Sequence, residues 1–535
     1  MLIKSIVAAI YLIAVFVLGY KGFKETKSGS DYMLAGRSMN PFVMAMSYGA
    51  TFISTSAIIG FGGVAALFGF SLMWLVFLNI FVGVFIAMVF FGKRTRRMGL
   101  ALNSQTFPEL LGKRYQSPFI QKFIGIIIFL FVPLYAAAVL IGICRMLEVG
   151  MGLDFNTSLI GFTLLLALYV ITGGLKAVMY TDAFQGAIML VMMIILAAMT
   201  YMKLGGFIPA HEALANMAHL VPEKLQAGGM VGWTQSPKFG SPIWLTVYTT
   251  IIYGVGVGVL AQPQLVVRFM TVARDRELNR AVLYGGLFIL FIPGVPYIVG
   301  ALSNVVFFEE FGKISIQMAQ GNIDKIIPLF IEKIMPNWYS ALFLMGMMAA
   351  AMSTLSSQYH VGGTSLGRDF LGQTDMGRKM DSLYASRLGV SVTIVVTLVW
   401  AFTLPGSVIA RATAFFFGLC AAAFLPAYLL GIYWKGMTRA GAIASLVGGF
   451  SMSMLWLLFV HLKEAKAIGL CQLLTGQETL VSHFPKGDWP WLLQYVDPNV
   501  AALPLSFLLA FVVSRMSTKL DKKHVDLCWS NMPNK

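Results

Sequence analysis

A cluster of hydroxyl side chains lies inside a long apolar segment of the chain, in the run Met345–His360. The cluster consists of Ser353, Thr354, Ser356 and Ser357. On a helix, positions 350, 353, 354 and 357 follow the i, i+3, i+4, i+7 pattern and share one face. Hydroxyls in hydrocarbon cost free energy unless they hydrogen-bond or ligate something. The stripe therefore predicts either back-bonding and helix–helix contact or a set of neutral oxygens for a hard cation.

Two other apolar segments carry interruptions. The polar run Thr51–Ser56 divides the segment 41–68, and Gly254, Gly256 and Gly258 precede Gln262-Pro263 at the end of the segment 241–262. Glycine permits close helix packing, but it also frees backbone, which survives at membrane depth only inside protein or along a cavity. These are spans two and seven, which inverted five-helix repeats would make equivalent. Broken helices at matching repeat positions indicate the midplane site of a transporter.

Composition and hydropathy place these segments in a membrane. Hydrophobic residues make up 58% of the 535 residues and charged residues 12%, whereas soluble domains carry roughly 25% charged residues. We predict an all-α polytopic membrane protein with about thirteen transmembrane helices of roughly 20 residues each. The spans lie near 3–20, 41–68, 71–92, 123–147, 157–178, 182–203, 241–262, 281–303, 338–364, 387–404, 409–433, 440–461 and 498–515.

These spans predict a single transporter domain over residues 1–535. Repeat one (spans 2–6) covers about 41–203 and repeat two (spans 7–11) about 241–433, with flanking spans at 3–20, 440–461 and 498–515. The first apolar run, Ser5–Leu18, lacks a small-residue cleavage site, so we expect an uncleaved span.

Basic residues predict the orientation of the chain. They concentrate at 93–97, 268–280, 368–387 and 515–523, which the thirteen-span order places on one side of the membrane. By the positive-inside rule the N-terminus lies outside and the C-terminus in the cytoplasm, in the plasma (inner) membrane. The net charge of +16 then reflects topology and contact with the lipid bilayer, so no nucleic-acid partner is expected.

Four dispersed segments match known motifs. Asp31–Arg37 reads DYMLAGR, similar to DYFLAGR, and Thr172–Gln185 is similar to the turn GGxxAVxxTDxxQ. Ala261–Met270 resembles GQPHILARFM of proline permeases, and Ala350–Ser356 resembles the ninth span of the same permeases. On these segments the chain, from about residue 1 to 520, resembles the sodium/solute symporters. That group contains the proline, pantothenate, monocarboxylate, sialic acid and sodium–galactose carriers.

The resemblance implies two sodium sites. The main Na⁺ site would use the backbone carbonyls of Ala50, Ile53 and Ala350 and the hydroxyls of Ser353 and Thr354. Such a set forms an oxygen cage without net charge. Some relatives have a second site, and here its positions are held by Asp182, Ser356 and Ser357. Asp182 has an alternative role as a helix cap.

The solute is less well defined by the sequence. Proline permeases have an aspartate where this chain has Phe52, and aromatic residues there resemble the pantothenate and monocarboxylate branches. The expected lining is polar beside span two and rather apolar beside span seven. Its residues are Thr51, Ser54, Ser56, Tyr253, Val255, Val259 and Gln262. Arg145 is the one cation near a span end that could reach an anion, unless it pairs with Glu148 at i+3.

We therefore predict a sodium-coupled symporter that imports a small organic solute, a monocarboxylate or a pantothenate-like acid. The alternatives are a proline-like amino-acid symporter, a proton-coupled carrier that uses His360 or Asp182, and a channel or membrane sensor. No enzymatic site is expected. His211-Glu212 is not part of an HExxH motif, the four cysteines lack metal spacing, and no GxxxxGK[ST] is present to bind a nucleotide.

Overall fold

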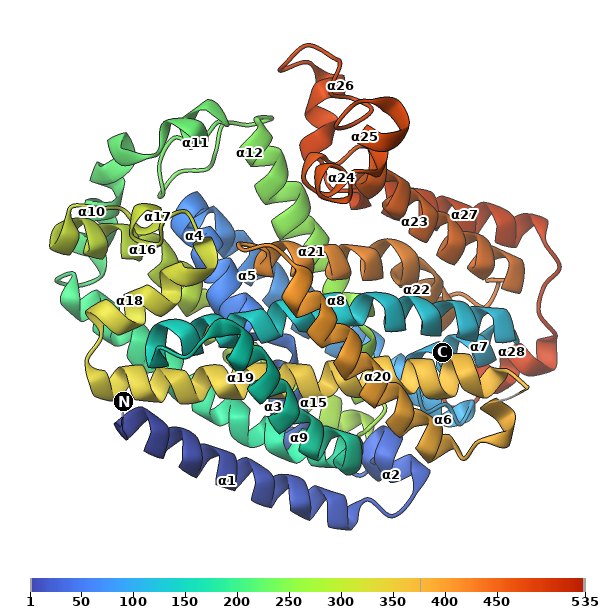
Figure 1. The fold of residues 1–535 in the computed structure, drawn as a ribbon. Coiled ribbons are helices and arrows are strands. Elements are labelled where there is room, and N and C mark those ends of the chain that lie inside the picture. The colour runs from blue at the N-terminus through green and yellow to red at the C-terminus, as the bar shows by residue number, and fades with distance from the viewer. Residues whose placement is uncertain (1, 376, 533–535) are drawn as a thin grey trace.

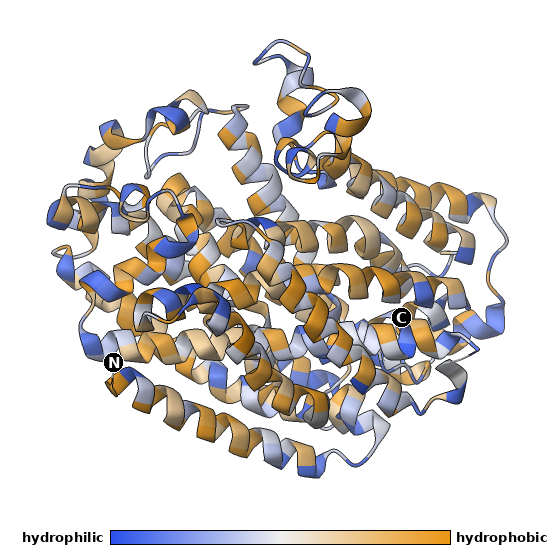
Figure 2. Ribbon diagram, in the orientation of Figure 1, coloured by the Kyte–Doolittle hydropathy of each residue, from blue (hydrophilic) through white to orange (hydrophobic). Residues whose placement is uncertain are grey.

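The computed structural model describes residues 2–375 and 377–532, apart from the side chains of Tyr169, Thr172 and Arg378. Thr172, in the second quoted motif, thus lies outside the described side chains. Within these residues the chain is helical and forms no β-strand, and an isolated parallel bridge joins Met39 to Val272. Long helices lie side by side through the molecule (Figure 1), and hydrophobic residues predominate along them (Figure 2). The prediction of an all-α membrane protein is confirmed.

Eleven stretches of the described chain are long and apolar enough to cross a membrane. They are Leu2–Glu25, Ser56–Ala101, Pro118–Met151, Gly174–Lys203, Pro242–Ala261, Asp275–Phe311, Asn337–Gln373, Ser382–Thr403, Ile409–Tyr433, Arg439–Phe459 and Asn499–Met516. The predicted spans 41–68 and 157–178 are not among them. The first is broken near its middle, and the apolar part of the second is the shorter helix Phe155–Leu168. The count of thirteen is therefore not confirmed.

The helices keep the following bounds. The longer ones are α1 (Leu2–Glu25), α3 (Pro41–Phe52), α8 (Pro118–Met151), α9 (Phe155–Lys203), α15 (Asp275–Phe291), α16 (Gly294–Phe311), α19 (Asn337–Thr364), α20 (Ser382–Thr403), α21 (Ile409–Leu419), α23 (Arg439–Phe459) and α27 (Asn499–Met516). Shorter ones include α2 (Gly29–Leu34), α4 (Phe61–Phe68), α5 (Met73–Leu78), α6 (Lys93–Ala101), α7 (Phe107–Arg114), α10 (Phe207–Asn216), α12 (Pro242–Leu245), α18 (Ile326–Ile334), α22 (Leu425–Tyr433) and α28 (Lys522–Trp529).

The first broken helix lies where the sequence predicts it. Asn40 caps α3, and Pro41 occupies its first turn, where a missing N–H costs nothing. The helix ends at Phe52, because Ile53 adopts an extended conformation (φ −97°, ψ 109°). A π-helical turn, η2 (Ser56–Gly60), and α4 then continue the chain. The polar run 51–56 thus spans the break.

The second break lies later than the glycines indicate. A π-helical stretch, η6 (Thr246–Gly254), leads into α13 (Val255–Gly258) and the short turn η7 (Val259–Ala261). Gln262 is extended (φ −70°, ψ 120°), and α14 (Pro263–Phe269) follows. The glycines stay helical and serve close packing: a Cβ on Gly258 would overlap the carbonyl oxygen of Phe417. Proline, which cannot continue the hydrogen-bond ladder, sets this break.

Three helices hold the first break in place. The helix α19 packs against α8 and α9, and α3 packs against α9 and α19. The helix α9 is kinked at Gly174, whose backbone has a positive φ (φ 62°, ψ −172°). A residue with a Cβ would be strained in this conformation, so the kink requires glycine. Its close neighbour is Tyr32. The stripe on α19 therefore faces both the broken helix and the start of the second half of α9.

A small cap covers one end of the molecule. It follows α23 and consists of α24 (Leu462–Ile468), α25 (Leu470–Thr475) and α26 (Trp489–Leu492). These helices stand together at the top of the view, near α12 (Figure 1). The helices α23 and α27, on either side of the cap in sequence, pack against each other.

Candidate functional site

Four oxygens of the predicted main cation site converge at the break in α3. The Ser353 hydroxyl donates to the carbonyl oxygens of Ala50 (2.9 Å) and Ala350 (3.3 Å). The Thr354 hydroxyl lies 3.4 Å from the Ala50 carbonyl and 3.3 Å from that of Thr51. All these residues are buried. The last carbonyls of a helix lack intrahelical partners, so the end of α3 supplies acceptors to the hydroxyls of α19.

This oxygen cluster is neutral. Both hydroxyls donate hydrogen bonds to carbonyl oxygens. A small hard cation could take the place of these hydrogen bonds by binding the hydroxyl and carbonyl oxygens directly. Nowhere in the described part of the chain do three or more His, Cys, Asp or Glu side chains gather around a possible metal position. The arrangement thus suits a weakly held, exchangeable monovalent cation.

The structure differs from the predicted ligand set in two carbonyls: one predicted carbonyl has no described contact with the cluster, and one that was not predicted does. Ile53 lies at the start of the extended stretch, and its N–H donates to Gly49, but among the described contacts it has none to the cluster. The carbonyl of Thr51, which the sequence did not single out for this role, lies there instead. A helix end offers several free carbonyls, and sequence alone does not tell which of them point inward.

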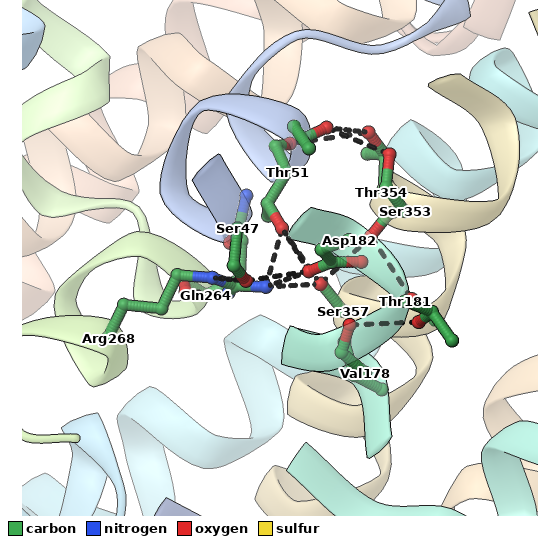
Figure 3. Close-up of polar contacts among 12 residues, drawn as sticks. Ser47, Thr51, Val178, Thr181, Asp182, Gln264, Arg268, Ser353, Thr354 and Ser357 are labelled. Carbon is green, nitrogen blue, oxygen red and sulfur yellow. Dashed lines mark hydrogen bonds and ion pairs between the residues drawn. The ribbon is translucent and has the colours of Figure 1, made fainter. Parts of the chain in front are cut away.

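A second cluster lies one helical turn further along α19 (Figure 3). Asp182 on α9 accepts hydrogen bonds from Ser47 (2.8 Å) and Thr51 (3.2 Å) of α3. Ser357 of α19 lies 3.0 Å from the Thr51 hydroxyl. Asp182 and Ser357, predicted for the second sodium site, are therefore brought close to a common neighbour.

A guanidinium group occupies the centre of this second cluster. Arg268 of α14 donates to Asp182 (2.9 Å), Ser357 (2.6 Å) and also Thr51. Further bonds reach Ser47 (3.0 Å) and the carbonyl of Gln264 (2.6 Å). The Arg268 side chain is 1% exposed and that of Asp182 is fully buried. A sodium ion that binds Asp182 here must compete with this arginine.

The sequence contained a signal for Arg268 that the prediction did not use. Arg268 interrupts the apolar run Leu265–Met270 directly after Gln262-Pro263, and an ionisable residue at membrane depth is a functional candidate by default. Arg268 entered the prediction only as part of the basic segment 268–280, which indicates the orientation of the chain. The structure instead buries it against Asp182.

Two other predicted polar residues make different contacts. Ser356 donates to the carbonyl of Ser353 on its own helix (3.1 Å), which is the back-bonding alternative, and has no described contact with Asp182. His360 is 2% exposed and packs beside Tyr32, with ring centroids 5.2 Å apart. Its Nδ1 has no hydrogen-bond partner among the described residues, so no proton path through it is visible there.

The residues predicted to line the solute site are mostly buried between the two breaks. Ser54 lies 3.4 Å from the Tyr135 hydroxyl and accepts from the Ser56 N–H. Gln262 accepts from Gln264. Tyr253 is partly exposed, whereas Val255 and Val259 are buried. Thr51 belongs to both polar clusters rather than to an open surface.

A cavity of about 510 Å³ lies beyond these residues, next to the cap. Thr250 and Ile251, one turn before Tyr253, line it together with Gly418 and Leu419 of α21. None of the seven predicted lining residues is part of its wall, as far as the described side chains show. The predicted solute region and this cavity therefore share no wall residue in the described part of the chain.

Arg145 takes the alternative role that the sequence left open. Its guanidinium pairs with Glu148 (2.7 Å), and Glu148 also pairs with Lys325 (3.0 Å). The guanidinium also lies 3.9 Å from the ring centroid of Phe155. Within the described part of the chain Arg145 is not in the wall of the cavity. Its charge is thus satisfied at the end of α8.

Comparison with known proteins agrees with this architecture. The model of the sodium:solute symporter family matches residues 32–449. The osmoregulated proline transporter OpuE of Bacillus subtilis is 28% identical over 473 residues, covering 87% of this chain and 90% of the relative. A sodium/proline symporter of Staphylococcus aureus is 27% identical over 490 residues, with 88% and 89% covered.

Structural comparison gives the same fold. A solved Na⁺-coupled sialic acid symporter in a substrate-bound outward-open state superimposes with a TM-score of 0.72 at 18% sequence identity. The match covers 97% of this chain and 99% of that one. The family match and the curated relatives show a polytopic membrane transporter that is coupled to sodium and is not an enzyme. Because the family model extends over most of the chain, the chain belongs to the sodium:solute symporter family.

Proposed function

We propose that this protein imports a small carboxylate-bearing solute together with Na⁺, and that L-proline is the first solute to test. The neutral oxygen cluster of Ala50, Ala350, Ser353 and Thr354 carries the sodium part of the proposal. It joins the broken helix α3 to α19, so an ion there would tie the two helices together. Sodium binding would thereby be coupled to the shape of the solute region beside the break.

Proline is supported by the relatives, whose names identify them as proline transporters. A monocarboxylate is the second candidate, supported by Phe52. This side chain is 5% exposed, and it lies near Val259, since both would contact a Cβ placed on Gly83. An aromatic ring in place of an aspartate removes a fixed negative charge and leaves an apolar contact for the body of the solute.

The two candidates differ in the charge that crosses the membrane. Proline is a zwitterion, so one Na⁺ carries one net charge inward, which yields about 2.3 kcal/mol per 100 mV. A monoanion with one Na⁺ carries none, and only the sodium gradient remains, about 1.4 kcal/mol per tenfold ratio. With two Na⁺ the monoanion would again move one net charge.

The test is uptake by the purified protein in sealed vesicles. A sodium gradient and a potassium-diffusion potential are imposed separately, with radiolabelled proline, lactate and pantothenate as solutes. Proline uptake that requires Na⁺ and increases with an inside-negative potential supports the first candidate. Sodium-driven lactate or pantothenate uptake without proline uptake supports the second. If none of the three is taken up with sodium but a sugar is, the carboxylate part of the proposal is wrong.

The same vesicles test proton coupling. Uptake driven by a pH gradient in sodium-free buffer would favour the proton-coupled alternative, whereas the oxygen cluster predicts no such uptake.

The orientation of the chain in the membrane is tested with single cysteines at two exposed positions. These are Phe239, between α11 (Glu223–Ala227) and α12, and Met516, at the end of α27. We propose that a membrane-impermeant maleimide labels position 239 in intact cells and position 516 only after lysis.

A further inference from the structure

The cavity beside the cap shares no wall residue with the predicted sodium and solute sites in the described part of the chain. It lies between α4, η6 and α21, and residues of the cap close one side of it. Its volume of about 510 Å³ falls within the range of small-molecule sites, roughly 300 to 1,000 Å³. The space is therefore large enough for an organic ligand with a ring or a short chain.

The charges on the cavity wall favour an anion. Three cationic side chains, Lys224, Arg411 and Lys463, face two acidic ones, Glu464 and Asp497. Glu464 is already engaged by Arg411 (3.2 Å) and by His461. Neither Lys224 nor Lys463 forms an ion pair within the described part of the chain, although Glu464 lies near enough to act on Lys463 electrostatically, and both lysines are exposed. Two lysine charges thus remain available to an incoming carboxylate.

The Glu464 carboxylate is fixed as an anion. Burial alone would raise its pKa, but His461 and Arg411 lower the pKa to about 2. Glu464 therefore stays ionised at neutral pH, where it pairs with Arg411. This leaves Lys463, its neighbour in the first turn of α24, as the cation best placed to receive a ligand.

The remaining wall is apolar with a few unsatisfied polar atoms. Phe68, Phe415 and Leu457 contribute hydrophobic surface. Thr250 Oγ1, Ser453 Oγ and His461 Nε2 lack a hydrogen-bond partner among the described residues, and such atoms in native proteins usually have a partner. A ligand with an apolar body and a polar end would match this wall.

The residues of the cap side lie outside the segment that defines the family. The family model ends at residue 449, whereas His461, Lys463, Glu464 and Asp497 all follow it. Of the three cationic wall residues, Lys463 thus follows the matched segment, whereas Lys224 and Arg411 lie within it.

From these observations we propose that the cavity is an outer binding site for a monoanionic organic carboxylate with an apolar body. Lys463 receives the carboxylate, Lys224 adds positive potential at the opening, and the apolar wall holds the body. The site is separate from the oxygen cluster at Ser353 and Thr354, and it binds without sodium. The proposal does not depend on which solute is carried.

Calorimetric titration of the full-length protein in sodium-free buffer tests the site. Benzoate is the probe, benzamide its uncharged match in shape, and acetate a carboxylate without the apolar body. Wild-type protein is expected to bind benzoate saturably, and benzamide and acetate at least about tenfold more weakly. Lys463→Gln is expected to weaken benzoate about fivefold, the scale of one partly solvated charge contact. High salt should weaken it too.

A matched control lies on the same helix. Lys466 of α24 is exposed, pairs with Glu478 and is not in the cavity wall, so Lys466→Gln is expected to leave benzoate binding unchanged. Equal affinity in wild type and Lys463→Gln would overturn the proposal, as would the absence of benzoate binding at 10 mM. The double variant Ser353→Ala with Thr354→Ala should retain benzoate binding. Binding that requires sodium and is lost in that variant would assign benzoate to the central region instead. Failure of sodium-driven uptake alone would affect only the proposed function.

Discussion

Two polar clusters lie on one face of α19, and they differ in the charge of the groups that surround them. Around Ser353 and Thr354, hydroxyls meet carbonyl oxygens, and the described hydrogen bonds involve no charged side chain. One turn further along, Ser357 meets the buried pair of Asp182 and Arg268. A cation that enters the first cluster replaces hydrogen bonds between neutral groups, whereas one that enters the second must also separate an ion pair. A cation that enters the first cluster would therefore exchange more easily, whereas the second cluster already contains the Arg268 guanidinium.

Thr51 connects the two clusters. Its carbonyl accepts from Thr354 in the neutral cluster, and its hydroxyl lies between Asp182, Ser357 and Arg268 in the charged one. A change in either cluster thus alters the surroundings of the same residue at the end of α3. The predictions below test whether the two clusters act as differently as their charges indicate.

The largest effect is expected from Arg268→Gln. Removing one partner of a buried ion pair leaves Asp182 uncompensated, which typically costs about 3 to 5 kcal/mol of stability. Thermal unfolding of the purified protein measures this loss. The variant Asp182→Asn with Arg268→Gln removes both charges and should be less destabilised than Arg268→Gln alone. Equal stability of wild type and Arg268→Gln would contradict the buried pair.

The next effect concerns the neutral cluster. Ser353→Ala with Thr354→Ala should raise the sodium concentration for half-maximal uptake by about tenfold or more, since each lost oxygen contributes roughly 1 kcal/mol. Ser356→Ala is the control, because Ser356 lies on the same helix and its hydrogen bond among the described residues is to the Ser353 carbonyl. Unchanged sodium dependence in a folded double variant would exclude this cluster as the sodium site.

The third prediction asks whether a second sodium ion displaces Arg268. If it binds Asp182, as the resemblance to the family implies, the Hill coefficient for sodium in wild-type uptake is close to two, and Asp182→Asn lowers it toward one while some uptake remains. Arg268→Gln, by removing the competing cation, should then lower the sodium concentration required. First-order dependence on sodium in the wild type would leave Asp182 with a structural role only.

A smaller effect is expected at the outer cavity when the pH changes. Burial raises the pKa of Asp497 to about 6, so the carboxylate is charged at pH 7 and becomes neutral as the pH falls to 5. Because one negative charge leaves the wall, benzoate, still an anion, should bind about twofold more tightly at pH 5.

The groups around Asp497 provide the control for this change. Asn499 donates to its carboxylate, and His461, Glu464 and Tyr253 are the titratable neighbours. Asp497→Asn should remove most of the pH dependence, and an undiminished change in that variant would exclude Asp497 as its source.

The smallest effect is expected from Arg145→Gln. Arg145 is held by Glu148 away from the cavity wall, and partly exposed pairs of this kind contribute up to about 1 kcal/mol to stability. The concentration for half-maximal solute uptake should change less than about twofold. A selective loss of carboxylate uptake would restore Arg145 to the solute site.

The sequence predicted the helical architecture, the location of the first break and the meeting of α3 with the hydroxyl stripe of α19. These follow from local patterns, namely hydropathy, a polar run inside an apolar segment and helical spacing. It did not predict the position of the second break, because Gly254–Gly258 could act either as a break or as a packing surface, and Gln262-Pro263 was decisive. Nor did it predict the pairing of Arg268 with Asp182. That contact joins residues 86 positions apart, and no local pattern specifies it.

The cavity beside the cap could not be predicted from the sequence either. Lys224, Arg411 and Lys463 are far apart along the chain, and each looks like an ordinary basic residue of a loop or helix end. Their convergence depends on how the cap helices settle over α21, which is decided by tertiary packing.

The bridge between Met39 and Val272 has a consequence for motion. The Met39 N–H donates to the carbonyl of Thr271, so the segment entering α3 is fastened to the segment leaving α14. Each of these helices is the piece that borders a break. A main-chain bond of this kind is independent of which side chains stand at either position. The two half-helices would therefore move together. Substitutions that change only side chains would leave this main-chain hydrogen bond in place, and so would not reveal its role.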